Sequence, residues 1–263
     1  MALLLALLVW ALALAGIVFL RLGFVSMPAA ASSAAQEVDS QLRLTFVATG
    51  IAFVAVQIAL GWLAFRYRAR AGRAARHVEG SRPLEWGGIV VVGAVFLGLA
   101  VLGQRVWAGL HLSGGEPQPL VVEVVGEQFA WNVRYPGPDG VFGRTDARLF
   151  DPATNPLGLV AEDPAAEDDV VSVNEVVVPV DRPIEVRLGS KDVLHSFFLP
   201  AMRIKQDTVP GLRVPLRFHP LRTGEFEIPC AELCGLGHYR MKGLLRVVTQ
   251  EEFETWLAEQ REP

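Results

Sequence analysis

Three long apolar segments occupy the first 112 residues, and each predicts a helix long enough to cross a membrane. They run from Ala2 to Leu20, from Leu44 to Phe65 and from Gly87 to Gly103. About 20 apolar residues in helical conformation span a hydrocarbon core of about 30 Å. We therefore expect three parts: an apolar helix or signal peptide at residues 1–25, a transmembrane helical hairpin at residues 40–112, and a soluble domain at residues 113–263.

An arginine-rich loop between the second and third apolar segments predicts the orientation of the chain. Residues 66–76 contain five arginines, and Arg82 follows them. Short loops rich in Lys and Arg remain in the cytoplasm. The third segment should then run outward through the cell (inner) membrane. We expect a multi-pass membrane protein whose C-terminal domain lies on the periplasmic or extracellular side.

The first apolar segment has two interpretations. The small residues from Ala29 to Ala34 resemble the cleavage site of a signal peptide. However, no basic region precedes the apolar core, and this core is longer than in most signal peptides, which favours a retained helix. With either interpretation, the Ala- and Ser-rich linker from Met27 to Asp39 should lie outside the membrane.

Short segments of alternating apolar and polar residues predict a β fold for the soluble domain. The alternation is clearest in Ile184–Leu188, Val214–Phe218 and Glu225–Ile228. Such strands bury one face, and several of them separated by turns favour an antiparallel sandwich or barrel over βαβ units. Residues 136–169 are rich in Pro, Gly and acidic side chains, which predicts a long surface insertion.

A short amphipathic helix is expected at the C-terminal end of the soluble domain. Thr249 and Glu252 have the spacing of a capping box. Phe253, Trp256 and Leu257 then form one apolar face. This face should pack against the sheet.

The formal charge is divided unevenly between the two halves of the chain. Residues 1–112 hold 9 Arg and 4 acidic residues, a net charge of +5, whereas residues 113–263 hold 15 Lys and Arg and 24 Asp and Glu, a net charge of -9, and together these give -4. An acidic domain repels nucleic acid and attracts basic proteins at low salt. We expect a basic redox protein as a partner and no nucleic acid, although acidic surfaces also serve solubility alone.

Both cysteines of the chain lie in one short segment with two other metal-binding side chains. Cys230, Cys234, His238 and Met241 are spaced by four, four and three residues. This spacing would fit one face of a helix, but the segment starts with a proline and contains two glycines, each of which weakens a helix by about 1 kcal/mol. We therefore interpret the segment as a loop that surrounds a bound metal.

The donor types in this loop favour copper in an electron-transfer site. Thiolate, thioether and imidazole groups together select copper. A mononuclear blue-copper site needs one Cys, whereas two thiolates can bridge two copper ions. Each copper would then need one imidazole and one weak axial donor. His195 can supply the second imidazole, and the carbonyl of Glu232 can supply the remaining axial oxygen.

Other interpretations of these residues are weaker. A lone Cys pair in an oxidising compartment is usually a disulfide, but His238 and Met241 follow at loop spacing. Zinc is disfavoured because Met is a poor zinc ligand. His219 is a spare histidine with a small chance of a metal role, and His77 and His111 flank the membrane segments, where lipid headgroups are expected.

Residues 40 to 260 resemble subunit II of the haem-copper oxidases, the cytochrome c oxidase type. The resemblance rests on the membrane topology, on the segment from Asp192 to Ser196, and on the pattern C-x-E-x-C-x3-H-x2-M that begins at Cys230. It implies an all-β cupredoxin-like Greek-key sandwich with a dinuclear CuA centre. In that centre Cys230 and Cys234 would bridge the coppers, His195 and His238 would each bind one copper, and Met241 and the Glu232 carbonyl would be axial ligands.

The resemblance also implies the function of an electron-accepting subunit in a proton-translocating oxidoreductase of the respiratory chain. Electrons from cytochrome c would pass through CuA to the haem of subunit I, which reduces oxygen, and subunit III would be a further partner within the lipid membrane. The Glu232 side chain would reach a magnesium site shared with subunit I. The chain has no C-x-x-C-H motif for covalent haem, so the donor should be a separate protein.

Two positions depart from the family pattern. The family commonly has a tryptophan, taken as the point where electrons enter, at the position of Phe129. Phe129 itself, Trp131 or Tyr135 could serve here, or the donor could bind differently, and a buried aromatic at this position is equally well explained by packing of the sheet. Glu85 matches a glutamate at the entrance of a proton pathway, but the tryptophan and proline that accompany it in the family are placed differently or missing. A solvated acid at a helix start is an equally good interpretation of Glu85.

Three alternative functions compete with that of an oxidase subunit. The CuA subunit of a nitric oxide reductase shares this domain and differs in its partner. A quinol-oxidising subunit II is disfavoured because that branch lacks the copper ligands. A membrane-anchored copper chaperone of the thioredoxin-like type also uses a C-x3-C pair, but its distant His lies downstream of the pair, whereas His195 lies upstream.

Overall fold

The computed structural model describes residues 2–22, 27–74, 77, 79–111 and 118–261, and the chain forms two compact units. One unit comprises Met1–Met27 and Asp39–Leu112, and the other comprises Pro28–Val38 and Ser113–Pro263. The first unit is helical and the second is built mainly from β-strands.

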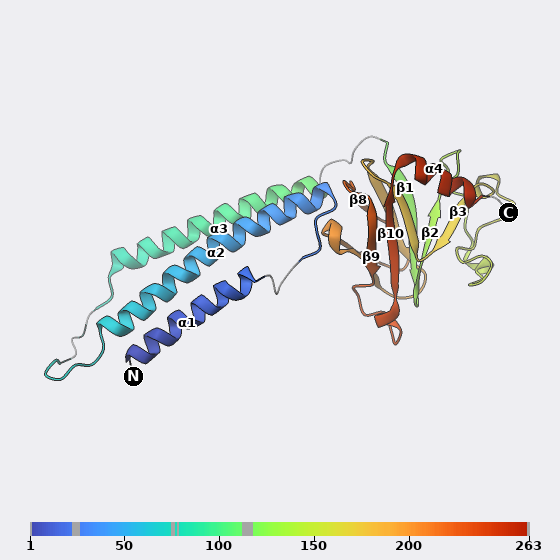
Figure 1. Ribbon diagram of the computed structural model, residues 1–263. Helices are drawn as coiled ribbons and strands as arrows, with labels where there is room; N and C mark the ends of the chain where they lie inside the picture. The colour runs from blue at the N-terminus through green and yellow to red at the C-terminus, as the bar shows by residue number, and fades with distance from the viewer. Residues whose placement is uncertain (1, 23–26, 75–76, 78, 112–117, 262–263) are drawn as a thin grey trace. The chain divides into compact units, whose positions relative to one another are not determined.

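The helical unit contains the three predicted apolar helices. They are α1 (Ala2–Arg21), α2 (Ser33–Arg66) and α3 (Arg82–His111), and each is long and apolar enough to cross a membrane (Figure 1). Gln41 on α2 donates a hydrogen bond of 3.2 Å to the Leu99 carbonyl on α3, which satisfies a polar group between apolar helices. Gly61 on α2 lies against the ring of Trp10, and any side chain at this position would overlap that ring.

The strands of the second unit form two main sheets and a two-stranded ribbon (Figure 1). The order is β3-β2-β1-β5-β8 in the larger sheet and β4-β10-β9 in the smaller one, and β6 pairs with β7. The strands are β1 (Leu120–Glu127), β2 (Ala130–Tyr135), β3 (Val170–Val173), β4 (Glu175–Pro179), β5 (Ile184–Ser190), β6 (His195–Leu199), β7 (Ile204–Thr208), β8 (Val214–Phe218), β9 (Gly224–Pro229) and β10 (Lys242–Val248).

The predicted sandwich is confirmed, but the expectation of purely antiparallel pairing is wrong for two strand pairs. β1 runs parallel to β5, and β10 runs parallel to β4. Parallel neighbours need a long crossover connection, and here the chain passes from β1 through strands of both sheets before it returns to β5. Alternation of apolar residues reports a buried face and contains no information about the direction of the neighbouring strand.

Tyr135 and the C-terminal helix join the two sheets. The Tyr135 hydroxyl donates to the Val177 carbonyl at 3.0 Å and accepts from the Val177 N–H at 2.7 Å, so it links β2 to β4. Helix α4 (Gln250–Glu259) has the predicted Thr249 and Glu252 capping box. Its buried residues Phe253 and Trp256 pack on Tyr135, with ring centroids 6.1 and 5.1 Å away.

Residues 136–169 form the predicted insertion, which has only two short 3₁₀ turns, Ala147–Leu149 and Pro164–Ala166. Arg134 on β2 holds the insertion in place. It forms an ion pair with Asp169 at 3.2 Å and donates a hydrogen bond to the Gly143 carbonyl at 2.8 Å. The insertion is therefore anchored to the sheet by a buried ion pair.

The segment Pro28–Val38, called here the docking segment, is part of the β unit rather than a solvated linker. The Ala31 N–H donates to the Ala201 carbonyl, and the Ala31 carbonyl accepts from the Leu221 N–H, both at 2.9 Å. The buried Ser32 hydroxyl donates to the Met202 carbonyl at 3.0 Å. Small side chains at these positions allow the backbone to approach the sheet residues closely, so the composition that resembles a linker serves packing.

Ser32→Ala should lower the free energy of unfolding of the full chain by about 1–2 kcal/mol. Besides its bond to Met202, the Ser32 hydroxyl accepts from the Ala35 N–H at 3.0 Å and so caps the start of α2. Urea unfolding in detergent, followed by tryptophan fluorescence, measures the effect. Ser33→Ala is the matched control, and equal stability of the two variants would contradict a structural role for the docking segment.

Candidate metal centre

Strand ends position three of the predicted metal ligands, and the other three lie in the loop between β9 and β10. His195 begins β6, Cys230 directly follows β9, and Met241 directly precedes β10. The chain between Cys230 and Met241, called here the metal loop, contains the 3₁₀ turn His238–Arg240 and no longer helix, as expected from its glycines. The Cys230 N–H donates to the Met241 carbonyl at 3.0 Å and closes the base of this loop. The loop is therefore fixed at both ends by the smaller sheet.

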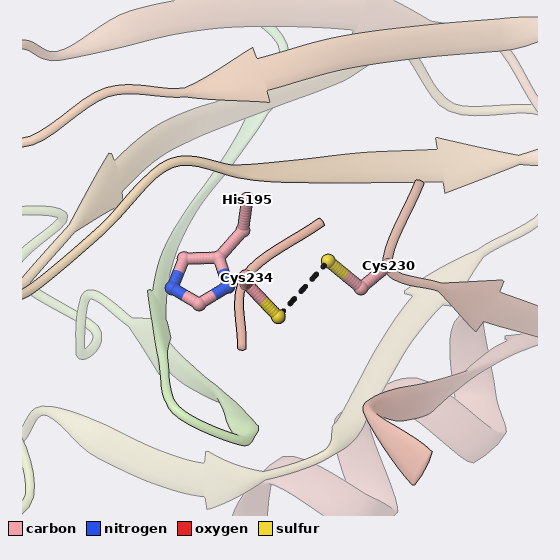
Figure 2. A group of neighbouring side chains, drawn as sticks. All are labelled: His195, Cys230 and Cys234. Carbon is pink, nitrogen blue, oxygen red and sulfur yellow. Dashed lines mark hydrogen bonds between the residues drawn. The ribbon is translucent and has the colours of Figure 1, made fainter. Parts of the chain in front are cut away.

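The donor atoms of His195, Cys230 and Cys234 converge in a buried cluster, within 4.8 Å of one another. Figure 2 shows the imidazole of His195 beside Cys234, whose sulfur faces that of Cys230. The two Sγ atoms are 3.8 Å apart, and both cysteines are free. A disulfide has sulfurs about 2.05 Å apart. The structure therefore has two adjacent thiols at this site.

The other three predicted ligands border this cluster. Nδ1 of His238 lies 3.5 Å from Cys234 Sγ, and Sδ of Met241 lies 3.7 Å from the same sulfur. The Glu232 carbonyl oxygen lies 3.2 Å from Cys230 Sγ. Two thiols are thus surrounded by two imidazoles, one thioether and one carbonyl, which is the donor set expected for a pair of copper ions.

The hydrogen bonding of His195 leaves one ring nitrogen for a metal. Its Nε2 lies 2.8 Å from Asp192 Oδ1, and because a carboxylate accepts, Nε2 donates. Nδ1 is buried and has no hydrogen-bond partner among the described residues. A buried polar atom without a partner costs about 1–3 kcal/mol. Coordination of a metal by Nδ1 removes this cost, so the residues present fit the copper pair.

The electrostatics of the cysteine pair keep the metal-free Cys234 thiol protonated. Burial and the neighbouring Cys230 raise the pKa of Cys234 to about 11. Near neutral pH the metal-free thiol therefore keeps its proton. Metal ligation requires the thiolate, so a metal ion must displace that proton and compensate the negative charge of two adjacent sulfurs.

The three candidate aromatic residues differ in their access to solvent. Trp131 is fully buried and packs edge-on against His195 and Phe197, with centroids 6.0 and 5.5 Å away. Tyr135 is buried between the sheets. Phe129 is half-buried and lies over the metal loop, where any side chain at Gly237 would overlap its ring. Of the three, Phe129 is the aromatic that reaches the surface at the metal loop.

The cluster does not include the remaining candidates. Glu85 is an exposed residue in the first turn of α3, and its role in a proton pathway stays a prediction. The His219 carbonyl accepts from the Ser33 N–H of the docking segment. His111 stacks on Trp107 at the end of α3, with centroids 5.0 Å apart, and His77 lies in the loop before α3.

Sequence reasoning missed the apolar tip of the metal loop. Leu233, Leu236 and Tyr239 are 77, 98 and 82% exposed. They lie between the ligands in the sequence. This placement could have predicted their exposure, because ligands that point toward a metal require the residues between them to point outward. Large exposed apolar side chains at one tip indicate a surface that a partner protein covers.

The β unit does not have the thioredoxin-like fold expected of the alternative copper chaperone. Within residues 118–261, the α-helix α4 comes after the last strand, so no helix connects parallel strands as in a βαβ unit. His195 also lies on a strand of the sandwich rather than downstream of the cysteine pair.

Comparison with known proteins gives matches over most of the chain. The family described as "Cytochrome C oxidase subunit II, periplasmic domain" matches residues 120–248. The alternative cytochrome c oxidase subunit 2 of Bradyrhizobium diazoefficiens is 37% identical over 226 residues, 85% of this chain and 80% of the relative. Cytochrome c oxidase subunit 2 of Synechocystis sp. is 31% identical over 256 residues, 88% of this chain and 75% of the relative.

Among solved structures, the crystal structure of the periplasmic domain of subunit II of cytochrome oxidase of Bradyrhizobium japonicum is 33% identical to this chain. The match covers 55% of this chain and 96% of that chain, with a TM-score of 0.41.

Copper binding should release protons and should tighten as the pH rises from about 6 to about 8. The reason is the pKa of Cys234, raised to about 11, which keeps the metal-free thiol protonated throughout this interval. Calorimetric titration of the full metal-free chain in buffers with different ionisation enthalpies measures the number of protons released. An affinity for copper that does not change with pH would contradict ligation by the thiols.

Proposed function

Because the chain belongs to the cytochrome c oxidase subunit II family, we propose that it carries electrons to the haem of subunit I through a dinuclear copper centre. It is a subunit of an oxidoreductase complex, in which oxygen reduction takes place in subunit I. The observation that carries the proposal is the buried pair of free thiols, 3.8 Å apart, beside an imidazole nitrogen that has no hydrogen-bond partner in the described part of the chain.

The proposed ligand set assigns a role to each donor. Cys230 and Cys234, whose sulfurs face each other, would hold both metals as thiolates. The imidazoles of His195 and His238, which stand on different segments, would each supply one nitrogen donor. The thioether of Met241 and the Glu232 carbonyl would supply the two weaker donors. When bound, the copper pair supplies a one-electron carrier whose charge is shared between two metals.

The protein scaffold keeps this site dry and rigid. Cys230, Cys234 and Met241 are buried, as is His195. The Ala231 N–H donates to the Ser196 carbonyl at 2.9 Å, which binds the metal loop to β6 beside His195. Ligands that hardly move when the charge of the site changes keep the reorganisation energy small. Electron transfer is then fast even at a small driving force.

The electron donor in this proposal is a basic cytochrome c. The net charge of -9 on residues 113–263 attracts a basic protein at low salt. Phe129 is the proposed point where electrons enter, since it lies over the metal loop while Trp131 and Tyr135 are buried. The exposed apolar tip at Leu233 and Leu236 is a surface for a partner subunit.

Several finer assignments extend the proposal. The three apolar helices anchor the protein in a membrane, which we propose is the inner membrane, crossed several times, with the β unit on the periplasmic side. Lipid and subunit III would surround the helices. A magnesium ion at the Glu232 carboxylate and a proton-pathway role for Glu85 belong to the same proposal. The relatives are named as cytochrome c oxidase subunits, which favours oxygen over nitric oxide as the final acceptor.

The full chain loaded with copper in detergent should show electron paramagnetic resonance hyperfine structure from one electron shared by two equivalent copper nuclei. Cys230→Ser should abolish this signal and the purple colour, because one bridging sulfur is lost. His238→Gln should also change the spectrum. His219→Gln is its matched control and should leave the spectrum unchanged, since His219 lies outside the cluster. Mononuclear copper splitting in the unmodified chain would overturn the proposal.

Phe129→Leu should slow the reduction of the copper centre by reduced cytochrome c, because an aromatic surface over the metal loop is lost. Stopped-flow absorbance measures this rate, and it should fall as ionic strength rises in both proteins. Phe142→Leu, in the insertion, is the control for the loss of a half-buried aromatic elsewhere, since Phe142 packs on Arg134 and Arg187. An unchanged rate in Phe129→Leu would place the site of electron transfer elsewhere.

A further inference from the structure

The two halves of the metal site come from segments far apart in the sequence, and a third segment connects them. His195 follows β5, whereas Cys234 lies in the loop after β9. The turn between β1 and β2 lies beside both of them and contributes Gln128. We call Asp192 and Gln128 together the polar bridge.

Three hydrogen bonds connect His195 to Cys234 through the two residues of the polar bridge. Nε2 of His195 donates to Asp192 Oδ1 at 2.8 Å. The other carboxylate oxygen, Oδ2, accepts from the Gln128 N–H at 2.7 Å. The side-chain amide of Gln128 then donates to the Cys234 carbonyl at 2.5 Å. A path of polar contacts therefore runs from one predicted copper ligand to another without passing through the metal site.

The metal loop is shaped to admit this amide. Gly235 follows Cys234 and has a φ of +132°, a conformation that side chains other than glycine rarely adopt. A Cβ atom at Gly235 would lie 2.6 Å from Gln128 Nε2. The glycine thus provides both the backbone conformation and the space that the Gln128 amide needs to reach the Cys234 carbonyl.

We propose that Asp192 and Gln128 are positioning residues of the copper centre, which fix the spacing and orientation of His195 relative to Cys234. This inference rests on the proposed copper function. Asp192 fixes the tautomer of His195, because a donating Nε2 leaves the lone pair on Nδ1, the nitrogen beside the thiols. Gln128 holds the backbone of Cys234 at the same time. Groups that orient metal ligands in this way commonly change metal affinity about 10–100-fold when they are removed.

A different role for Asp192 must be distinguished from this one. Asp192 is 32% exposed, and a basic donor protein could bind its charge directly. Glu127 provides the matched control, since it is adjacent to Gln128 in sequence and carries the same charge. Its carboxylate pairs with Lys191 at 2.6 Å and takes no part in the polar bridge.

The test uses the full chain in detergent, loaded with copper, with the variants Asp192→Asn, Gln128→Ala, their combination, and Glu127→Gln as the control. Two readouts are independent of activity: the copper hyperfine pattern in electron paramagnetic resonance, and the rate of copper release to a chelator. Each single variant should release copper about 10–100-fold faster and change the hyperfine pattern. The double variant should be no worse than the more severe single variant, because both break one path.

The control Glu127→Gln should match the unmodified chain in both readouts. Unchanged spectra and release rates in Asp192→Asn and Gln128→Ala would overturn the inference while leaving the copper function intact. If cytochrome c then reduced both Asp192→Asn and Glu127→Gln more slowly, Asp192 would be assigned to donor binding. If the unmodified chain itself shows no two-copper signal, the proposed function fails together with the inference.

Discussion

Two cysteine side chains held side by side in a buried site can act as metal ligands only after they lose their protons, and the resulting thiolates need positive charge beside them. Burial together with the neighbouring Cys230 raises the pKa of Cys234 to about 11, so the metal-free Cys234 thiol stays protonated near neutral pH. A neighbouring imidazole nitrogen on His195 has no hydrogen-bond partner among the described residues. A bound metal would displace the thiol proton, compensate the charge of the thiolates and satisfy this nitrogen.

The sandwich serves this constraint by bringing strand ends together. β6 carries His195, and β9 and β10 carry the two ends of the metal loop. Phe197 on β6 forms a β-bridge with Cys230, so the ribbon and the smaller sheet meet beside the sulfurs. Because His195 and both ends of the metal loop stand where strands end, the stability of the core fixes these positions, and a loop that contains glycine can hold a defined geometry.

The sequence allowed prediction of features that depend on local chemistry. The spacing of Cys230, Cys234, His238 and Met241 indicated a metal loop, and Thr249 with Glu252 indicated the start of α4. Features that depend on distant partners were missed, because the parallel pairing of β1 with β5 leaves no local pattern. The same holds for Gln128, whose side chain is ordinary for a surface turn and acquires its role only from the carbonyl of Cys234.

The docking segment makes folding of the β unit dependent on a part of the chain that is synthesised much earlier. Ser32 and Met202 are separated by 170 residues, and two helices that are long and apolar enough to cross a membrane lie between them. Contacts across so long a loop form late in folding. The segment around Ser32 must therefore stay available outside the bilayer while the apolar helices enter the membrane, and only then can it complete the domain. Insertion into the membrane and closure of the copper-binding half are steps of one assembly sequence.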